Sequence, residues 1–528
     1  MDIFGRIFSS FQRFSGEGTY LILFLCALFF VYLHEKRKSV KLTFVEYSIG
    51  IGLLMIFPLT ALVIMDYLIG EEVYWRMFWL LPIPFVMAYA AVRLLEREKN
   101  GKKVFLAFFL CAVVMLSGKL VYANGEIERS SNLEKIPSES IEVCNALSRD
   151  AIQNGLKKKR VVVPSELLPY VRQYDATIEM PYGRNAIKQE KLSENCDNIY
   201  GIMCKKKAED MDLLHLTGLL KTEDCNYLVM KLDVAVNAGT ELGQYGYMQV
   251  AATEHYVLYR CDDTSQHCYK ITQHPNEKNS MFYTIKCDMG GLIVVDGGWA
   301  DNAEETREVI RENGNKVDAW FITHPHKDHA GAFCEIYKEP QGMEIDMVYA
   351  VNMADETLCE ENAPWDTFET LEAFKALTIP QLQYVHKGDK LSVDGLDIDI
   401  LNAYDDYVDE ISNDLLNDGS MMFKVTGSTQ SMLFCGDVGV SMSDYLLSEY
   451  GNTLKSNYLQ MGHHGNGGLK DDFYRTVAPS VAFFDAPESL MNPVIPDKYT
   501  TPENRKLMKK LGADIRYFAM GENSVVLK

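Results

Sequence analysis

The stretch VDAWFITHPHKDHAG, residues 317–331, decides the fold of the C-terminal half of this chain. Its apolar run at residues 319–322 is typical of a buried strand. Three histidines and an aspartate follow within six positions: His324, His326, Asp328 and His329. Imidazole and carboxylate groups bind zinc and similar divalent ions, so a tight loop at the end of a strand can serve two adjacent metals with these side chains. The alternative is a polar loop that is rich in histidine without binding metal.

Three further motifs surround this loop in the sequence. They are a strand that ends in an aspartate, a second such strand and a histidine pair: GLIVVDGG (residues 291–298), MLFCGD (432–437) and LQMGHHG (459–465). Four motifs in this order are more specific than any one alone. They resemble the metallo-β-lactamase superfamily, and the resemblance covers about residues 280–528. The His-His-Gly form, preceded by NDGS at residues 417–420, is most similar to the hydrolase domain of competence DNA-uptake proteins (the ComEC-like branch).

The resemblance implies both a fold and a site. The fold is an αββα sandwich over residues 280–528, in which two β-sheets pack face to face with helices outside. The cofactors are two divalent metals, Zn or Mn, at one edge of the sheets. The implied metal ligands are His324, His326, Asp328, His329, Asp437 and His463. Asp328 and Asp437 are the implied catalytic residues, because Asp437 bridges two metals whose shared hydroxide is the nucleophile.

Four more residues are expected to stand behind these ligands. Asp296 is expected to orient a ligand histidine, and the alternative is a turn aspartate before two glycines. His464 is able to replace His463, since adjacent residues exchange roles with a small rotation of the backbone. Asn417 and Ser420 belong to the NDGS segment of the competence branch.

The chain departs from the family at one ligand. The family usually supplies another histidine between the histidine-rich loop and the bridging aspartate, and here that interval contains only His386, in a predicted hairpin. The resemblance to the competence branch implies that the segment from Asn417 to Ser420 occupies the vacant place. The position of His324 and His326 would then bind metal weakly or prefer a harder ion such as manganese. A noncatalytic binding or sensing module on the same fold is the alternative function.

Residues 1–125 have the composition of a membrane region. Four apolar segments approach the roughly 20 residues that a helix needs to cross a bilayer, and they predict four transmembrane helices: residues 20–33, 45–67, 74–95 and 104–122. The first and third connectors are basic, which places them in the cytoplasm by the positive-inside rule. We expect a multi-pass plasma-membrane protein whose C-terminal domains are extracytoplasmic, although Arg6 and Arg13 oppose this orientation.

Residues 126–138 form a predicted linker, and residues 139–275 form a small α/β domain of unknown role, because strands and helices alternate there.

Ten cysteines follow the membrane region. The pairs Cys261/Cys268 and Cys196/Cys204 are spaced for local disulfides in an oxidising compartment, and the alternative is that they are buried free thiols. Further on, residues 355–364 are acidic and predict an irregular lip, followed by a helix at residues 365–377.

The charge of the chain bears on its substrate. The formal net charge is −21, and the part beyond residue 125 has 39 Lys and Arg against 64 Asp and Glu, a net charge of −25. A nonspecific grip on nucleic acid needs a basic surface. The motifs predict a phosphodiesterase or nuclease-like hydrolase, and this charge weakens the case for nucleic acid as its substrate, so that cell-envelope phosphodiesters remain open.

Overall fold

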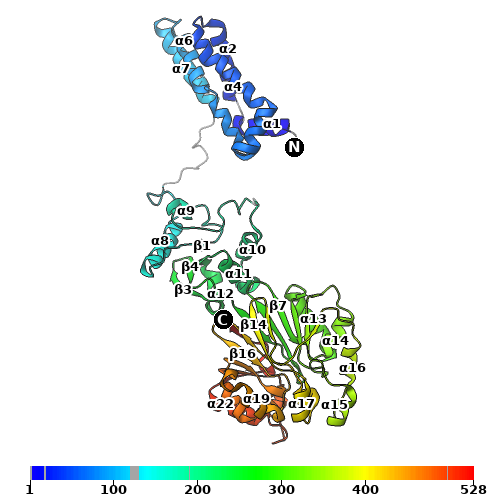
Figure 1. The fold of residues 1–528 in the computed structure, drawn as a ribbon. Coiled ribbons are helices and arrows are strands. Elements are labelled where there is room, and N and C mark those ends of the chain that lie inside the picture. The colour runs from blue at the N-terminus through cyan, green and yellow to red at the C-terminus, as the bar shows by residue number, and fades with distance from the viewer. Residues whose placement is uncertain (1–2, 17–18, 119–129, 189–190, 496) are drawn as a thin grey trace. The chain divides into compact units, whose positions relative to one another are not determined.

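The computed structural model describes residues 3–16, 19–118, 130–188, 191–495 and 497–528. The chain divides into two compact units, Met1–Ser130 and Ser131–Lys528 (Figure 1). Part of the predicted linker and the end of the fourth predicted span fall within residues 119–129, outside the described residues.

The N-terminal unit is made of helices. Two of its helical stretches are long and apolar enough to cross a membrane, Lys38–Ile56 with 19 residues and Glu71–Leu95 with 25. A third span results if α1 and α2, which meet at 94°, count as one broken span. The elements are α1 (Ile3–Ser15), α2 (Thr19–His34), α3 (Lys38–Val40), η1 (Lys41–Glu46), α4 (Tyr47–Ile56), α5 (Pro58–Val63), η2 (Ile64–Leu68), η3 (Glu71–Leu80), α6 (Ile83–Leu95) and α7 (Asn100–Leu116).

The prediction of four transmembrane helices is therefore not supported, because the described part of this unit contains two such helices, or three. The predicted span at residues 45–67 is interrupted where Phe57 leaves the helical conformation and Pro58 begins α5. Proline lacks the N–H that would continue the preceding helix. The predicted span at residues 20–33 corresponds to α2, which has 16 residues and falls short of a full crossing on its own.

The second unit begins with a small α/β layer. Its four-stranded sheet has the order β1-β2-β4-β3, with β1 parallel to β2 and the other pairs antiparallel. The strands are β1 (Val161–Val162), β2 (Tyr227–Lys231), β3 (Tyr247–Ala252) and β4 (Tyr256–Cys261). The helices are α8 (Ser138–Gln153), α9 (Val171–Tyr174), α10 (Glu194–Met203), η4 (Ala208–Asp210), α11 (Leu213–Thr222) and α12 (Leu232–Gln244). This layer has an apolar core of its own.

Helix α11 joins this layer to the rest of the unit. Lys221 Nζ lies 3.1 Å from Asp288 Oδ2, and both side chains are buried. Gly218 approaches so closely that a Cβ atom there would lie 2.0 Å from the carbonyl oxygen of Asp288. A second ion pair joins Lys286 and Asp212 at 2.8 Å. The small layer is therefore held against the following sheet by specific contacts.

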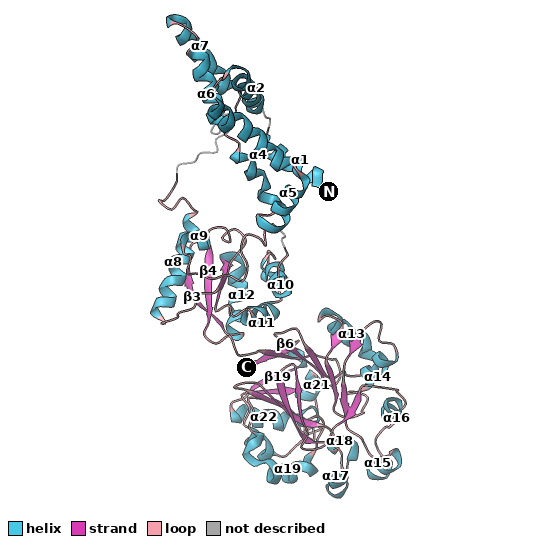
Figure 2. Ribbon diagram, turned by 45° about the horizontal axis from the view of Figure 1, so that its top comes forward, coloured by secondary structure: helices cyan, strands magenta, loops and turns pink. Residues whose placement is uncertain are grey.

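Two seven-stranded mixed sheets form the rest of the unit, as Figure 2 shows with helices on their outer sides. The first has the order β12-β11-β9-β7-β6-β5-β20 and the second β13-β14-β15-β16-β17-β18-β19. The strands of the first are β5 (Tyr269–Gln273), β6 (Phe282–Cys287), β7 (Leu292–Asp296), β9 (Ala319–Ile322), β11 (Val348–Ala350), β12 (Leu382–Tyr384) and β20 (Asn523–Leu527). Those of the second are β13 (Lys390–Val393), β14 (Leu396–Asn402), β15 (Met422–Thr426), β16 (Ser431–Phe434), β17 (Tyr458–Gln460), β18 (Val481–Phe484) and β19 (Asp514–Tyr517).

The remaining elements cover these sheets or connect their strands. They are β8 (Lys316–Val317), paired with β10 (Glu344–Ile345), and the helices η5 (Ala300–Asn302), α13 (Ala303–Glu312), α14 (Gly331–Lys338), α15 (Glu356–Asn362), α16 (Glu369–Lys375), α17 (Asp406–Ile411), α18 (Leu415–Asp418), η6 (Val440–Met442), α19 (Ser443–Tyr450), η7 (Gly451–Leu454), η8 (Gly462–Gly465), α20 (Asp471–Val477), α21 (Glu488–Met491), α22 (Thr501–Leu511) and η9 (Phe518–Met520). The prediction of an irregular segment at residues 355–364 is wrong, since α15 lies there.

Strand β9 explains why the two sheets pack as they do. Successive side chains of a strand point to opposite faces. Trp320 therefore packs against Phe333 of α14, with ring centroids 5.0 Å apart, while Phe321 stacks on Phe423 of the second sheet at 5.3 Å. Both faces of the strand are buried, which is why its sequence is apolar throughout.

Two boundaries differ from the prediction. Strand β5 lies inside the predicted α/β domain (residues 139–275), yet it pairs with β6 and β20 in the first large sheet. The predicted helix at residues 365–377 begins only at Glu369, so residues 365–368 precede it.

The predicted disulfides are also absent. All twelve cysteines of the chain lie among the described residues and are free. The Cys261 sulfur contacts the carbonyl oxygen of Asp263, and the Cys268 sulfur lies 3.3 Å from Lys221 Nζ. These two cysteines are buried small side chains.

Candidate metal centre

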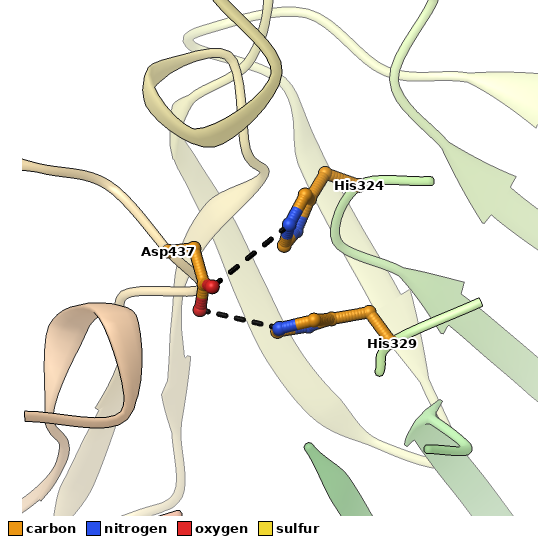
Figure 3. Close-up of side chains that lie close together, drawn as sticks. All are labelled: His324, His329 and Asp437. Atoms are coloured by element: carbon orange, nitrogen blue, oxygen red, sulfur yellow. Dashed lines mark ion pairs between the residues drawn. The ribbon is translucent and has the colours of Figure 1, made fainter. Parts of the chain in front are cut away.

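The candidate site lies where strands of both sheets end. The loop after β9 carries His324 and His329, and the turn after β16 carries Asp437. Figure 3 shows these three side chains pointing toward one another. Asp437 Oδ1 lies 3.2 Å from His329 Nε2, and Asp437 Oδ2 lies 4.0 Å from His324 Nε2. All three side chains are buried, so the sandwich itself fixes their positions.

Two overlapping groups of possible ligands result. His324, His329 and Asp437 form one, and Asp328, His329 and His464 form the other, with the ligand atoms of each group within 4.8 Å of one another. The predicted ligands of the histidine-rich loop are thus brought together with Asp437. His326 joins them through His324, since His326 Nδ1 lies 2.9 Å from His324 Nε2.

The two histidines of the His-His-Gly motif exchange their predicted places. His464 Nε2 lies 3.2 Å from Asp328 Oδ2 and 3.3 Å from Asp437 Oδ2, and its side chain is buried. His463, the predicted ligand, is 36% exposed and lies 3.9 Å from Asp437. Both residues have positive φ, 48° for His463 and 57° for His464. This left-handed turn aims the second ring inward, a geometry that motif spacing does not reveal.

Asp296 lies behind the cluster and contacts His329. Its Oδ2 lies 2.7 Å from His329 Nδ1 and accepts a hydrogen bond from Thr323 Oγ1 at 2.6 Å. Its Oδ1 accepts the backbone N–H of Thr323 at 2.7 Å. Asp296 is completely buried. The carboxylate therefore fixes both the ring of His329 and the start of the loop, as expected from its place at the end of β7.

Two residues near the loop were not predicted. Asn279 Nδ2 donates to Asp328 Oδ2 at 2.7 Å, and Asp366 Oδ2 lies 2.7 Å from His326 Nε2. Asn279 precedes β6 and Asp366 lies between α15 and α16. Neither belongs to a motif, so only the folded chain shows that they reach the site.

The remaining predicted residues lie farther from the candidate ligand atoms. Ser420 Oγ accepts a hydrogen bond from the backbone N–H of Asp437 at 3.3 Å. Asn417 donates through Nδ2 to Asp414 at 2.8 Å, and its buried Oδ1 has no hydrogen-bond partner among the described residues. His386 has a side chain that is 63% exposed, next to Asp389. It lies outside both ligand groups and does not supply the histidine that the family pattern lacks.

Burial and neighbouring charges shift the pKa values of the cluster in different directions. Burial, followed by the charges of His329 and His326, lowers the pKa of His324 well below its usual value, so that this ring is neutral. Burial also disfavours the charged form of His464, but Asp437 and Asp328 together outweigh it and raise the pKa to about 10. For Asp328 burial opposes ionisation, yet the hydrogen bond to His464 and the charges of His329 and His464 together lower the pKa to about 2.

These residues fit a pair of divalent cations. Asp437 Oδ1 is buried and has no hydrogen bond of good geometry among the described residues, although His329 Nε2 is 3.2 Å away. A buried carboxylate oxygen without a donor is costly unless a cation compensates it. Nitrogen and oxygen donors of this kind suit zinc, manganese and iron.

Comparisons with known proteins give one family match and several similar solved structures. Residues 275–341 match the family model described as Metallo-beta-lactamase superfamily. Among solved structures, the metallo-beta-lactamase fold protein YhfI from Bacillus subtilis matches with 11% identity and a TM-score of 0.33, over 49% of this chain and 100% of that protein. CmlA, a diiron beta-hydroxylase from Streptomyces venezuelae, matches with 12% identity and a TM-score of 0.33, over 51% of this chain and 55% of that one.

A diphosphatase from the PhnP family also matches, with 12% identity and a TM-score of 0.29, over 50% of this chain and 98% of that one. No curated protein matches the chain. These comparisons do not test the finer assignment to the competence-protein branch, which stays a proposal. The chain contains a metallo-beta-lactamase superfamily domain, matched at residues 275–341, and the loop from His324 to His329 lies within it.

Proposed function

We propose that the chain is a membrane-anchored, metal-dependent hydrolase of phosphodiesters. The observation that carries this proposal is the buried cluster in which Asp437 faces the nitrogen atoms of His329 and His464 at 3.2 and 3.3 Å. Buried carboxylates are costly unless they are compensated, and divalent cations bound here would compensate Asp328 and Asp437 together. Members of the superfamily are usually metal-dependent hydrolases, which makes hydrolysis the simplest use of the cluster.

The residues present divide between two metal positions, for Zn or Mn. His324 and His326 would hold one metal, and Asp328, His329 and His464 the other, with Asp437 shared. Two divalent cations held there would lower the pKa of a water molecule and withdraw charge from the oxygens of the substrate. Asp296 holds the ring of His329, and Asn279 holds the carboxylate of Asp328.

A pair of lysines beside the cluster favours an anionic substrate. Lys278 Nζ lies 4.9 Å and Lys327 Nζ 5.4 Å from the ring centroid of Trp299. Lys327 directly precedes Asp328, and Lys278 directly precedes Asn279. Lys278 is partly offset by Asp301, whose Oδ2 lies 3.9 Å away, so the positive patch is a small one in a unit whose sequence is strongly acidic. A small phosphodiester or an envelope polymer of modest charge suits this local patch better than a long nucleic acid, which needs a broad basic surface.

The helices Lys38–Ile56 and Glu71–Leu95 support membrane anchoring. Exposed apolar side chains on α7, such as Phe105 and Phe108, suit a lipid environment. We also propose that the chain crosses the plasma membrane more than once and that its hydrolase domain lies outside. The basic connectors between the apolar segments support this orientation. The free cysteines remove the support that disulfides would have given to this orientation.

Metal analysis and a substrate panel test the proposal together. The full chain, purified in detergent, is dialysed against zinc or manganese and its metal content is measured by mass spectrometry. We expect two equivalents per chain and turnover of bis(p-nitrophenyl) phosphate above that of p-nitrophenyl acetate or a chromogenic β-lactam. A folded chain that binds no metal would instead support the noncatalytic binding or sensing module.

A further inference from the structure

Asp366 is held in a fixed position next to the candidate metal centre. It lies in the loop between α15 and α16, and its side chain is 18% exposed. Its Oδ1 accepts the backbone N–H of Thr367 at 2.8 Å, and its own N–H donates to the carbonyl oxygen of Ala363 at 3.0 Å. These bonds leave Oδ2 directed at His326 Nε2, 2.7 Å away.

The two nitrogens of His326 therefore have different neighbours. Nδ1 faces inward, 2.9 Å from His324 Nε2, which is also the His324 nitrogen nearest to Asp437. Nε2 faces outward, toward Asp366. A neutral imidazole carries its proton on one nitrogen and offers a lone pair on the other. A carboxylate at Nε2 accepts that proton in a hydrogen bond and so leaves the Nδ1 lone pair free to bind a metal.

His329 shows the same arrangement with the opposite nitrogen. Asp296 Oδ2 lies 2.7 Å from His329 Nδ1, which leaves Nε2 facing Asp437 at 3.2 Å. The two carboxylates thus select opposite tautomers in two histidines of one loop. Asp296 acts on the second metal position and Asp366 acts on the first.

We propose that Asp366 is a positioning residue, which holds His326 with its proton on Nε2 and thereby maintains zinc affinity at the position of His324 and His326. This inference rests on the proposed metal-binding function. Without Asp366 we expect a large loss of zinc affinity at this position. The sequence offers no further histidine there, so the metal would depend on fewer ligands. An outer carboxylate of this kind typically contributes about 10–100-fold in metal affinity.

Zinc titration of the full chain in detergent tests the inference without reference to activity. The apo protein is titrated against a chromophoric chelator for the wild type, Asp366→Ala, Asp366→Asn and Asp366→Glu. We expect Asp366→Ala to weaken one of two binding steps by about 10–100-fold. Asp366→Asn is expected to lose less zinc affinity, because its amide oxygen still accepts a hydrogen bond. Asp366→Glu should keep most of the wild-type zinc affinity.

Two matched variants separate tautomer control from a general effect on the loop. Asp355→Asn removes a carboxylate charge from the same loop region, while the amide oxygen still accepts the backbone N–H of Leu358, 3.0 Å from Asp355 in the wild type, and should leave both zinc steps unchanged. Asp296→Asn should weaken the other zinc step. Wild-type affinity at both steps in Asp366→Asn and Asp366→Ala would overturn the inference, and so would an equal loss in Asp355→Asn. A wild-type chain without zinc would overturn the proposed function instead, so the two failures are distinguishable.

Discussion

Asp437 is the residue on which the candidate centre converges, because its two oxygens lie 3.2–4.0 Å from the nitrogens of four histidines. Asp437→Ala removes the carboxylate shared by both metal positions. Phosphodiester turnover should fall by several orders of magnitude, since metal catalysis supplies several kcal/mol of transition-state stabilisation. Asp296→Asn should cost only about 10–100-fold. Turnover and circular dichroism are measured for both, and full turnover in a folded Asp437→Ala chain would exclude the two-metal mechanism.

The exchange of His463 and His464 gives a second prediction for single residues. His464 is buried and lies within 3.3 Å of Asp437, whereas His463 is partly exposed at 3.9 Å. His464→Ala should remove about one metal equivalent per chain and most of the activity, and His463→Ala should retain both metals. The two variants are a matched pair, since they remove the same side chain from neighbouring positions. The reverse ranking in metal content would restore the order expected from the motif.

Contiguous motifs made part of this site predictable. The histidine-rich loop, Asp296 and Asp437 each follow an apolar strand, and strand ends of one sandwich meet at one edge. Asp366 and Asn279 were missed because they are 40 and 49 residues from the side chains they contact and carry no motif. The sequence left open which of His463 and His464 faces the site, because the choice depends on the left-handed backbone conformations of these two residues.

At the level of secondary-structure elements, strands were easier to predict than their boundaries. Strands β7 and β9 are covered on both faces, so their sequences are continuous apolar runs. Helix α15 was predicted as irregular because its acidic sequence lacks an apolar stripe, yet the Asp355 side chain caps its first turn. The assignment of β5 depended on pairing with β20, which is more than 240 residues away and invisible in local sequence.

The contact of helix α11 with the first large sheet yields a prediction for packing. Gly218→Ala places a Cβ atom 2.0 Å from the carbonyl oxygen of Asp288, so the helix must move away and disturb the buried pair of Lys221. We expect a loss of about 1–3 kcal/mol in stability, the usual range for overpacking. Gly201→Ala in α10 is the control, because a Cβ atom added there meets no neighbour within 4 Å and alanine favours a helix. Thermal unfolding of both should show a lower midpoint only for Gly218→Ala.

The chain consists of a unit of apolar helices and a second unit that is strongly acidic. Residues 1–125 contain 13 Lys and Arg against 9 Asp and Glu, and the rest of the chain has a net charge of −25. A hydrolase held at a membrane meets substrates within reach of that surface, so the side on which it lies decides which phosphodiesters are available. The orientation is therefore the property of the whole chain that most narrows its function.

Cys204 allows this orientation to be measured. Among the described residues of Ser131–Lys528 it is the one exposed cysteine, while the others are buried. Burial raises the pKa of thiols such as that of Cys225, to about 12, so they react slowly with maleimides. With Cys26 and Cys111 replaced by alanine, a membrane-impermeant maleimide should label intact cells through Cys204.

Labelling before lysis is expected if the hydrolase domain is extracytoplasmic, because the basic connectors then lie inside. Cys204→Ser in the same background should abolish the signal, which shows that the reagent reports on this position and on no buried thiol. Lysed cells provide the maximum signal for comparison. Labelling that occurs only after lysis would place the domain in the cytoplasm, and cytoplasmic phosphodiesters would then replace envelope polymers as its substrates.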